Sequence, residues 1–181
     1  CHADPAGLFC PSCAAAVQET AGGDCPRCAL WLGPHARIRR CRACAVSPPP
    51  FLRAVAWARY EGPVRDALHA LKFRGQEGLA RRLAAPLVAR LRTERFVRRL
   101  DAVTCVPPVR GWFGPVHPAV WIGREVARAL SRPWAPRLLA RARRVTPQRA
   151  LNRPARRRNV AGAFAGRPAA RGKQVLLVDD V

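Results

Sequence analysis

Acidic residues are scarce in this chain, and one long stretch has none. The 181 residues include 11 Asp and Glu against 33 Lys and Arg, which gives a net charge of +22. Between Glu125 and Asp179 there is no acidic residue, whereas fourteen Arg and Lys lie there. A positive field of this size attracts polyanions such as nucleic acid, and also anionic small molecules. The alternative is a solvated basic face, with part of the Arg content reflecting overall composition.

Long apolar runs and methionine are missing too. The longest apolar runs, such as residues 102–106, suit buried strands and fall far short of the roughly 20 residues of a membrane span. A transmembrane segment is therefore not expected. The chain begins at Cys1, has no Met and ends at Val181 inside a motif, so we expect a C-terminally incomplete fragment. Its length suits one core domain plus a small appendage, and 49% apolar residues can fill that core.

Cysteine, by contrast, is abundant and regularly spaced. Cys25 and Cys28 form one C-x-x-C pair, Cys41 and Cys44 form another, and twelve residues separate the pairs. A gap of two residues lets both thiolates of a pair turn toward one ion, and two pairs complete a tetrahedron. The spacing is typical of a zinc ribbon and predicts a structural Zn²⁺ site at these four residues.

A second set of cysteines precedes this one. Cys10 and Cys13 form a third C-x-x-C pair, and Cys1 resembles half of a fourth. We interpret Cys1, Cys10 and Cys13 as ligands of a first, incomplete ribbon. A disulfide framework and a redox C-x-x-C are the alternatives, and both fit three clustered pairs less well. Cys105 stands alone in an apolar run, which favours a small core residue.

The chain divides by composition at a proline-rich linker, residues 47–50. Residues 1–47 are predicted to form the metal module, in which metal binding supplies folding energy. Residues 51–181 are predicted to form an α/β domain with a mainly parallel sheet flanked by helices. The expected strands are 51–60, 101–106 and 175–178, and the expected helices are 63–73, 79–96 with a kink or a split at Pro86, and 119–130.

The last strand ends in two adjacent carboxylates, Asp179 and Asp180. Ligands of open α/β sheets bind outside the carboxyl ends of the strands. Paired acids there suggest contacts to the hydroxyls of a ligand or to its metal ion. An ordinary core strand that ends in a solvated acidic turn is the alternative.

Several motifs together resemble the ComF family, whose members combine a double zinc ribbon with a phosphoribosyltransferase-like domain. The resemblance covers nearly the whole chain. It rests on the cysteine pairs and on five further stretches: Tyr60-Glu-Gly-Pro63 with Ala70-Leu-Lys-Phe-Arg-Gly75, Thr146-Pro-Gln148, Leu151-Asn152, Arg156-Arg-Arg-Asn159-Val-Ala-Gly-Ala-Phe164, and Gly172-Lys-Gln-Val-Leu-Leu-Val-Asp-Asp-Val181.

The resemblance implies a cytoplasmic accessory protein of natural transformation, including a peripheral position at the inner face of the membrane. It implies single-stranded DNA as a ligand and a DNA-uptake helicase as a partner. It also implies that Asp179 and Asp180 contact the ribose of phosphoribosyl pyrophosphate (PRPP), with Mg²⁺ alongside. Two alternatives stay open: an active phosphoribosyltransferase, and a zinc-stabilised adaptor with a degenerate transferase site.

One stretch departs from the family pattern. Where the family has a basic run that ends in Arg-Gly-Phe-Asn-Gln, residues 108–123 contain Arg110 and His117 with few other polar groups. Loss of these groups puts pyrophosphate binding at this stretch in question. Further anion contacts are predicted at residues that otherwise read as plain surface charge, and these are Lys72, Arg74, Arg156, Arg157 and Arg158.

Overall fold

The computed structural model describes residues 7–34, 36, 40–108, 117–143 and 152–180, with backbone only for 153, 154, 156 and 157. It contains two compact units, the first running through Val97 and the second comprising Arg98–Asp180. The proline-rich linker at 47–50, predicted to divide a metal module from an α/β domain, lies inside the first unit. That division stays a prediction.

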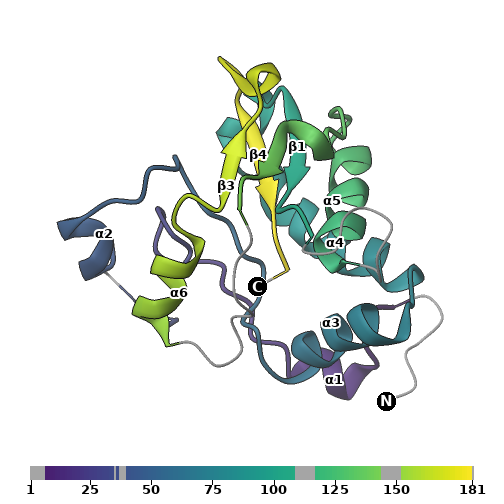
Figure 1. Ribbon diagram of the computed structural model, residues 1–181. Coiled ribbons are helices and arrows are strands. Elements are labelled where there is room, and N and C mark those ends of the chain that lie inside the picture. Colours follow the sequence, from purple (N-terminus) through teal and green to yellow (C-terminus); the bar gives the residue numbers. More distant parts are fainter. Residues whose placement is uncertain (1–6, 35, 37–39, 109–116, 144–151, 181) are drawn as a thin grey trace. The chain divides into compact units, whose positions relative to one another are not determined.

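Helices and loops make up the first unit (Figure 1). Its helices are α1 (Pro11–Ala15), α2 (Arg42–Val46), α3 (Gly62–Arg74) and α4 (Gly78–Arg92), and the 3₁₀ segment η1 (Arg95–Arg99) follows α4. Helix α3 begins with a proline in its first turn and ends at Gly75, whose φ of 63° is the left-handed conformation that glycine adopts without strain. The predicted helix at 63–73 is confirmed.

The apolar residues of α3 and α4 recur at helical spacing and form the helical core of this unit. Val64, Leu68 and Leu71 are buried on α3, and Leu83 and Val88 are buried on α4. Helix α4 continues through Pro86, so a split at this residue is wrong, whereas a kink stays a prediction. Proline removes one backbone hydrogen bond from a helix, and here the buried face of α4 on both sides of Pro86 holds the helix together.

The predicted strand at 51–60 is also wrong. Its backbone groups bond to loops instead: the Ala54 N–H donates to the Arg27 carbonyl (2.9 Å), and the Arg59 N–H donates to the Gln18 carbonyl (2.9 Å). Only an isolated bridge joins Ala58 to Glu19. The alternating apolar pattern of residues 51–60 therefore belongs to an irregular segment that bonds to loops, and not to a strand of a sheet.

The second unit contains a small parallel strand pair, which confirms the α/β class. Its strands are β1 (Ala102–Cys105), β2 (Leu139–Arg141), β3 (Phe164–Gly166) and β4 (Val175–Val178), and its helical segments are α5 (Pro118–Ala129), α6 (Arg153–Val160), η2 (Pro136–Leu138) and η4 (Pro168–Ala170). Strand β1 pairs in parallel with β4, with Cys105 opposite Val178, and β2 pairs antiparallel with β3. Wider strand order and a transferase-type sheet stay predictions.

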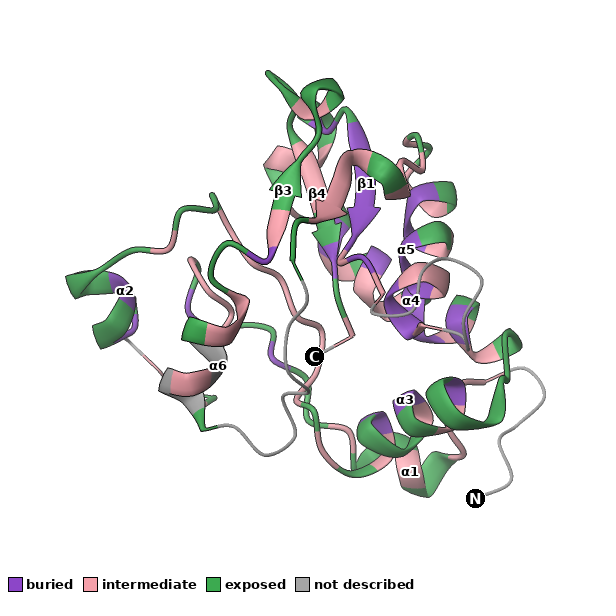
Figure 2. Ribbon diagram, in the orientation of Figure 1, coloured by how far each residue is buried: buried purple, intermediate pink, exposed green. Residues whose placement is uncertain are grey.

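Helix α5 covers the β1–β4 pair (Figure 1). All four residues of β1 are buried, and the buried residues of α5 form a stripe along the helix (Figure 2). Gly123 lies on that stripe and contacts the Trp134 ring. A Cβ added at Gly123 would lie 2.8 Å from this ring, which is too close for any larger residue. Among the described helices, none has both the length and the apolar content needed to cross a membrane.

Candidate metal centre

The first cysteine pair lies in a tight turn closed by backbone hydrogen bonds. The Cys25 N–H donates to the Leu30 carbonyl (2.9 Å), and the Ala29 N–H donates to the Cys25 carbonyl (2.9 Å). An antiparallel bridge between Asp24 and Trp31 closes the base of the turn. Ala29, directly after Cys28, has a φ of 56°, which is unfavourable for a residue with a Cβ.

The second cysteine pair lies at the start of α2. Cys41 is the N-cap residue, and its Sγ accepts a hydrogen bond from the Cys44 N–H at 3.4 Å. The Cys41 N–H in turn donates to the Cys25 Sγ at 3.4 Å. Backbone N–H groups thus donate to two of the sulfur atoms, those of Cys25 and Cys41.

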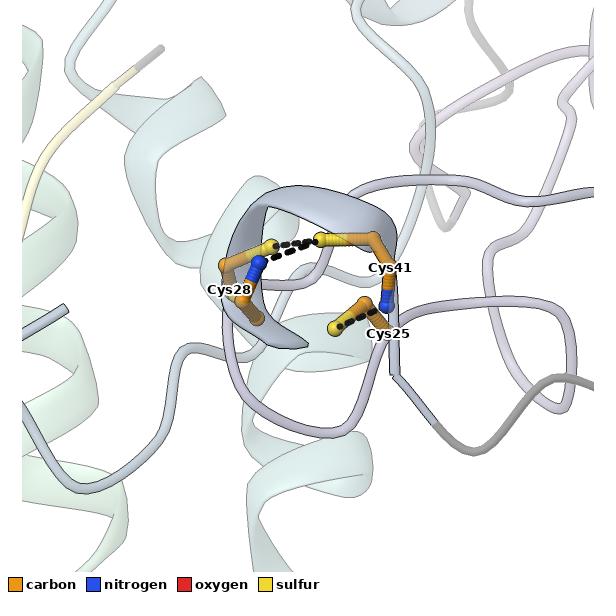
Figure 3. Close-up of side chains that lie close together, drawn as sticks. Cys25, Cys28 and Cys41 are labelled. Carbon is orange, nitrogen blue, oxygen red and sulfur yellow. Dashed lines mark hydrogen bonds between the residues drawn. The ribbon is translucent and has the colours of Figure 1, made fainter. Parts of the chain in front are cut away.

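The structure brings the two pairs together. The sulfur atoms of Cys25, Cys28, Cys41 and Cys44 all lie within 4.8 Å of one another. The Cys28 and Cys41 sulfur atoms face each other at 3.7 Å, with Cys25 beside them (Figure 3). Zn–S bonds of about 2.3 Å in a tetrahedron require sulfur atoms about 3.8 Å apart. The four thiols, three of them buried, therefore fit a closed structural Zn²⁺ site.

The thiols of this cluster differ in acidity. Burial alone would raise the pKa of Cys25, but the N–H groups of Cys41, Cys28 and Arg27 outweigh it and lower the pKa to about 6. Burial raises the pKa of Cys28. Burial, together with the neighbouring thiols, raises the pKa of Cys44 to about 12. Zn²⁺ binds thiolates, so an ion in this cluster would displace the protons held by Cys28 and Cys44.

The other cysteines that the structure describes, Cys10, Cys13 and Cys105, are not part of this cluster. The seven cysteines that the structure describes carry free thiols, which does not favour the disulfide alternative. Cys10 lies 3.3 Å from the Ser12 hydroxyl, and this contact together with hydrogen bonds from Cys13 lowers its thiol pKa to about 7. Cys13 lies on α1. Cys1 lies outside the described residues, so the first ribbon stays a prediction. Cys105 is buried in β1, where a small core residue was expected.

Arginine side chains tie the first cysteine turn to the segment that follows α2. The Arg27 guanidinium donates to the carbonyls of Pro49 and Leu52, at 2.8 Å each. Arg53 returns the contact by donating to the Pro26 carbonyl at 2.9 Å. Sequence reasoning missed these contacts because an arginine that binds distant carbonyls leaves no spacing pattern. The proline-rich segment is thus attached to the metal cluster through Arg27.

A largely buried ion-pair network continues from the cluster into α4. Arg90 lies 3.5 Å from Asp24 and 3.1 Å from Glu94, and Glu94 lies 2.6 Å from Arg53. Asp24, whose side chain is 5% exposed, immediately precedes Cys25. Of these contacts only the spacing of Arg90 and Glu94, four residues apart along the chain, was visible in the sequence.

The remaining predicted site residues lie in both units. In the second unit Asp179 and Asp180 follow β4, and the Asp180 N–H donates to the Asp179 carboxylate at 3.0 Å. Arg158 is exposed on α6, and His117 is the N-cap residue of α5. In the first unit Lys72 and Arg74 are exposed in the last turn of α3. The predicted residues that lie outside the described part of the chain are Arg110, Thr146–Gln148, Leu151, Val181 and the side chains of Arg156 and Arg157.

Comparison with known proteins relates the chain to proteins named for DNA utilization. It is 28% identical over 162 residues to "DNA utilization protein YhgH" of Escherichia coli K12, a match that covers 87% of this chain and 70% of the relative. The proteins of the same name from Escherichia coli O157:H7 and Shigella flexneri are 29% and 28% identical over the same shares. No family model and no solved structure matches the chain.

Proposed function

We propose that this chain is a competence-type accessory protein that binds single-stranded DNA and carries one structural Zn²⁺ at Cys25, Cys28, Cys41 and Cys44. The observation that carries the proposal is the homology to proteins named for DNA utilization. The acid-free segment between Glu125 and Asp179 supports it, because Arg and Lys residues neutralise phosphates. A DNA-uptake helicase and the inner face of the membrane are the partner and place that the proposed role implies.

Within the acid-free segment, three exposed cations are our candidates for contacts to a DNA backbone. Arg167, Arg171 and Lys173 flank η4 on the connection between β3 and β4, and all three are exposed. Other arginines of the segment are engaged: Arg143 donates to the Asn159 and Ala161 carbonyls at 2.9 and 2.6 Å. We therefore assign phosphate contacts to the cations around η4.

A salt titration of single-stranded DNA binding tests this function. Binding is expected to weaken steeply with salt. Replacing Arg167, Arg171 and Lys173 by Gln is expected to reduce the slope of log K against log salt by about 2, since each phosphate contact contributes about 0.7. The matched control replaces three exposed arginines of the first unit, Arg42, Arg81 and Arg92, by Gln. Equal losses in both variants, or no binding by the unsubstituted chain at low salt, contradict the proposal.

A transferase function is the second candidate, favoured by the position of Asp179. Asp179 and Asp180 directly follow the carboxyl end of β4. Strands β1 and β4 are parallel, and ligands of parallel sheets bind outside the carboxyl ends of the strands. These carboxylates would hold the ribose hydroxyls of PRPP and its Mg²⁺. PRPP with Mg²⁺ should then raise the melting temperature of the unsubstituted chain but not of Asp179→Asn. No shift in either protein favours the zinc-stabilised adaptor over a transferase.

A further inference from the structure

Three aromatic rings lie together on the first unit. Tyr60 precedes α3, and His69 and Phe73 lie four residues apart on α3, a spacing that brings side chains together on one face. The Tyr60 hydroxyl lies 3.0 Å from His69 Nε2. Phe73 packs edge-on against His69, with ring centroids 5.7 Å apart. Tyr60, His69 and Phe73 together form the aromatic face.

The aromatic face does not belong to the core of the unit. Phe73 is 63% exposed and Tyr60 is 43% exposed. The side chains that α3 buries are Val64, Leu68 and Leu71, and none of them belongs to the aromatic face. Single exposed apolar residues are ordinary on a protein surface, but a cluster with defined mutual geometry indicates a binding surface.

A hollow of about 770 Å³ adjoins the aromatic face. Its lining includes Phe9 and Cys13, and His69, Phe73 and Arg74 of α3. Its volume is typical of a small-ligand pocket. A planar aromatic group that entered it would meet the rings of His69 and Phe73.

The charge around this face is positive. Lys72 and Arg74 lie in the last turn of α3, next to Phe73 in the sequence, and both are exposed. Asp66, which also lines the hollow, is paired with Arg65 at 3.2 Å. A ligand that combines aromatic rings with negative charge therefore complements the surface.

We propose that the aromatic face and the adjoining hollow bind unpaired bases of single-stranded DNA, with the bases stacked on Phe73 and His69 and a neighbouring phosphate on Arg74. The inference rests on the proposed function and adds to it a site for the bases. The basic segment supplies phosphate contacts, but its two aromatic side chains are already occupied. Trp134 packs against Gly123, and Phe164 lies under the Arg141 guanidinium at 5.0 Å. Base stacking therefore needs another surface, and the aromatic face provides one.

Phe73→Ala tests the inference, with Phe51→Ala as the matched control because Phe51 is another exposed phenylalanine of the first unit. Affinity is measured for single-stranded DNA, for the duplex and for a single strand without bases. Phe73→Ala is expected to weaken binding of single-stranded DNA about 5- to 150-fold, as loss of one stacked base predicts, and to leave binding of the duplex and the abasic strand unchanged. Phe51→Ala should bind all three probes like the unsubstituted chain.

Three further variants distinguish the effect of the Phe73 ring from the effect of the Arg74 charge. Phe73→Trp should keep single-stranded DNA affinity, whereas Phe73→Leu should lose it, because leucine keeps apolar bulk without a stacking face. Arg74→Gln should lower the salt slope by about 0.7, and Phe73→Ala should not change it.

Several results would overturn the inference. If Phe73→Ala or Phe73→Leu binds single-stranded DNA as tightly as the unsubstituted chain, stacking on Phe73 is wrong, although the proposed function stands. If Phe73→Ala loses abasic and normal strands equally, the effect does not come from the bases, and a role of the aromatic face in contacting a protein becomes the better account. If the unsubstituted chain binds no single-stranded DNA, the inference and the proposed function fail together.

Discussion

The Arg90 guanidinium lies 3.5 Å from the Asp24 carboxylate and thereby joins α4 to the residue that precedes the first cysteine of the metal cluster. Both side chains are largely buried, at 19% and 5% exposed, and Arg90 also contacts Glu94 at 3.1 Å. One side chain therefore holds two carboxylates from distant parts of the first unit.

Arg90→Gln is expected to destabilise the first unit by about 2–4 kcal/mol, because it leaves the buried Asp24 and Glu94 carboxylates without this cation. Urea unfolding of the zinc-loaded protein measures the loss. The control is Arg81→Gln on the same helix, where the arginine is exposed and the expected change is within about 0.5 kcal/mol. Equal stability of the two variants would show that the network contributes little.

Cys44→Ser is expected to remove about one Zn²⁺ per chain, because three thiolates no longer close the tetrahedron. Metal analysis after washing with chelator gives the number of ions retained. Cys105→Ala, which removes a cysteine from the second unit, should retain the same zinc content as the unsubstituted chain. Purified protein that contains disulfides among Cys25, Cys28, Cys41 and Cys44 and no metal would contradict the site.

Ala29→Gly is expected to stabilise the first unit by about 0.5–1 kcal/mol. The φ of 56° at Ala29 costs an L-residue about 1–2 kcal/mol, which exceeds the entropic cost of glycine. The same substitution at Ala89, exposed in the interior of α4, should instead destabilise by about 1 kcal/mol. Unfolding curves of both variants check the opposite signs. Destabilisation by Ala29→Gly would mean that the turn after Cys28 tolerates the Cβ without strain.

Cys105 is expected to resist alkylation until the second unit unfolds. Burial, with a smaller effect from the Asp179 charge, raises its pKa to about 12, above the ordinary value of 9.0. The folded state favours the neutral Cys105 thiol. This contribution to the free energy of unfolding is complete below pH 9 and is lost as the pH rises toward 12. Mass spectrometry after iodoacetamide treatment in the absence and presence of urea locates the label. Rapid labelling of Cys105 in folded protein at pH 8 would contradict its burial.

Local patterns predicted much of this structure. The spacing of Cys25, Cys28, Cys41 and Cys44 predicted one cluster, since two residues between ligands constrain each turn and two such turns can share an ion. The apolar runs at 102–105 and 175–178 predicted two buried strands, and both are strands that pair in parallel. The predicted burial holds for 102–105 but is wrong for most of 175–178, where Val178 is buried and Leu177 is 51% exposed.

The sequence could not reveal which distant segments supply the hydrogen-bond and ion-pair partners of these residues. The alternation at 51–60 is compatible with a strand, but the backbone of that segment bonds to the loop at 18–27. Arg27 and Arg90 look like surface charges in a basic sequence until their carbonyl and carboxylate partners are known. The aromatic face was partly visible, because His69 and Phe73 are four residues apart, but the position of Tyr60 against them depends on the turn before α3.

The β1–β4 ladder sets an order of events during synthesis. The Gln174 N–H donates to the Asp101 carboxylate at 2.7 Å across 73 residues of sequence. While the ribosome is still translating α5 and α6, that side of β1 has no strand partner, whereas α3 and α4 are neighbours along the chain and can pack as soon as they emerge. The second unit therefore acquires its central pairing last, and nascent chains arrested before β4 should expose β1 to protease in ribosome-bound assays.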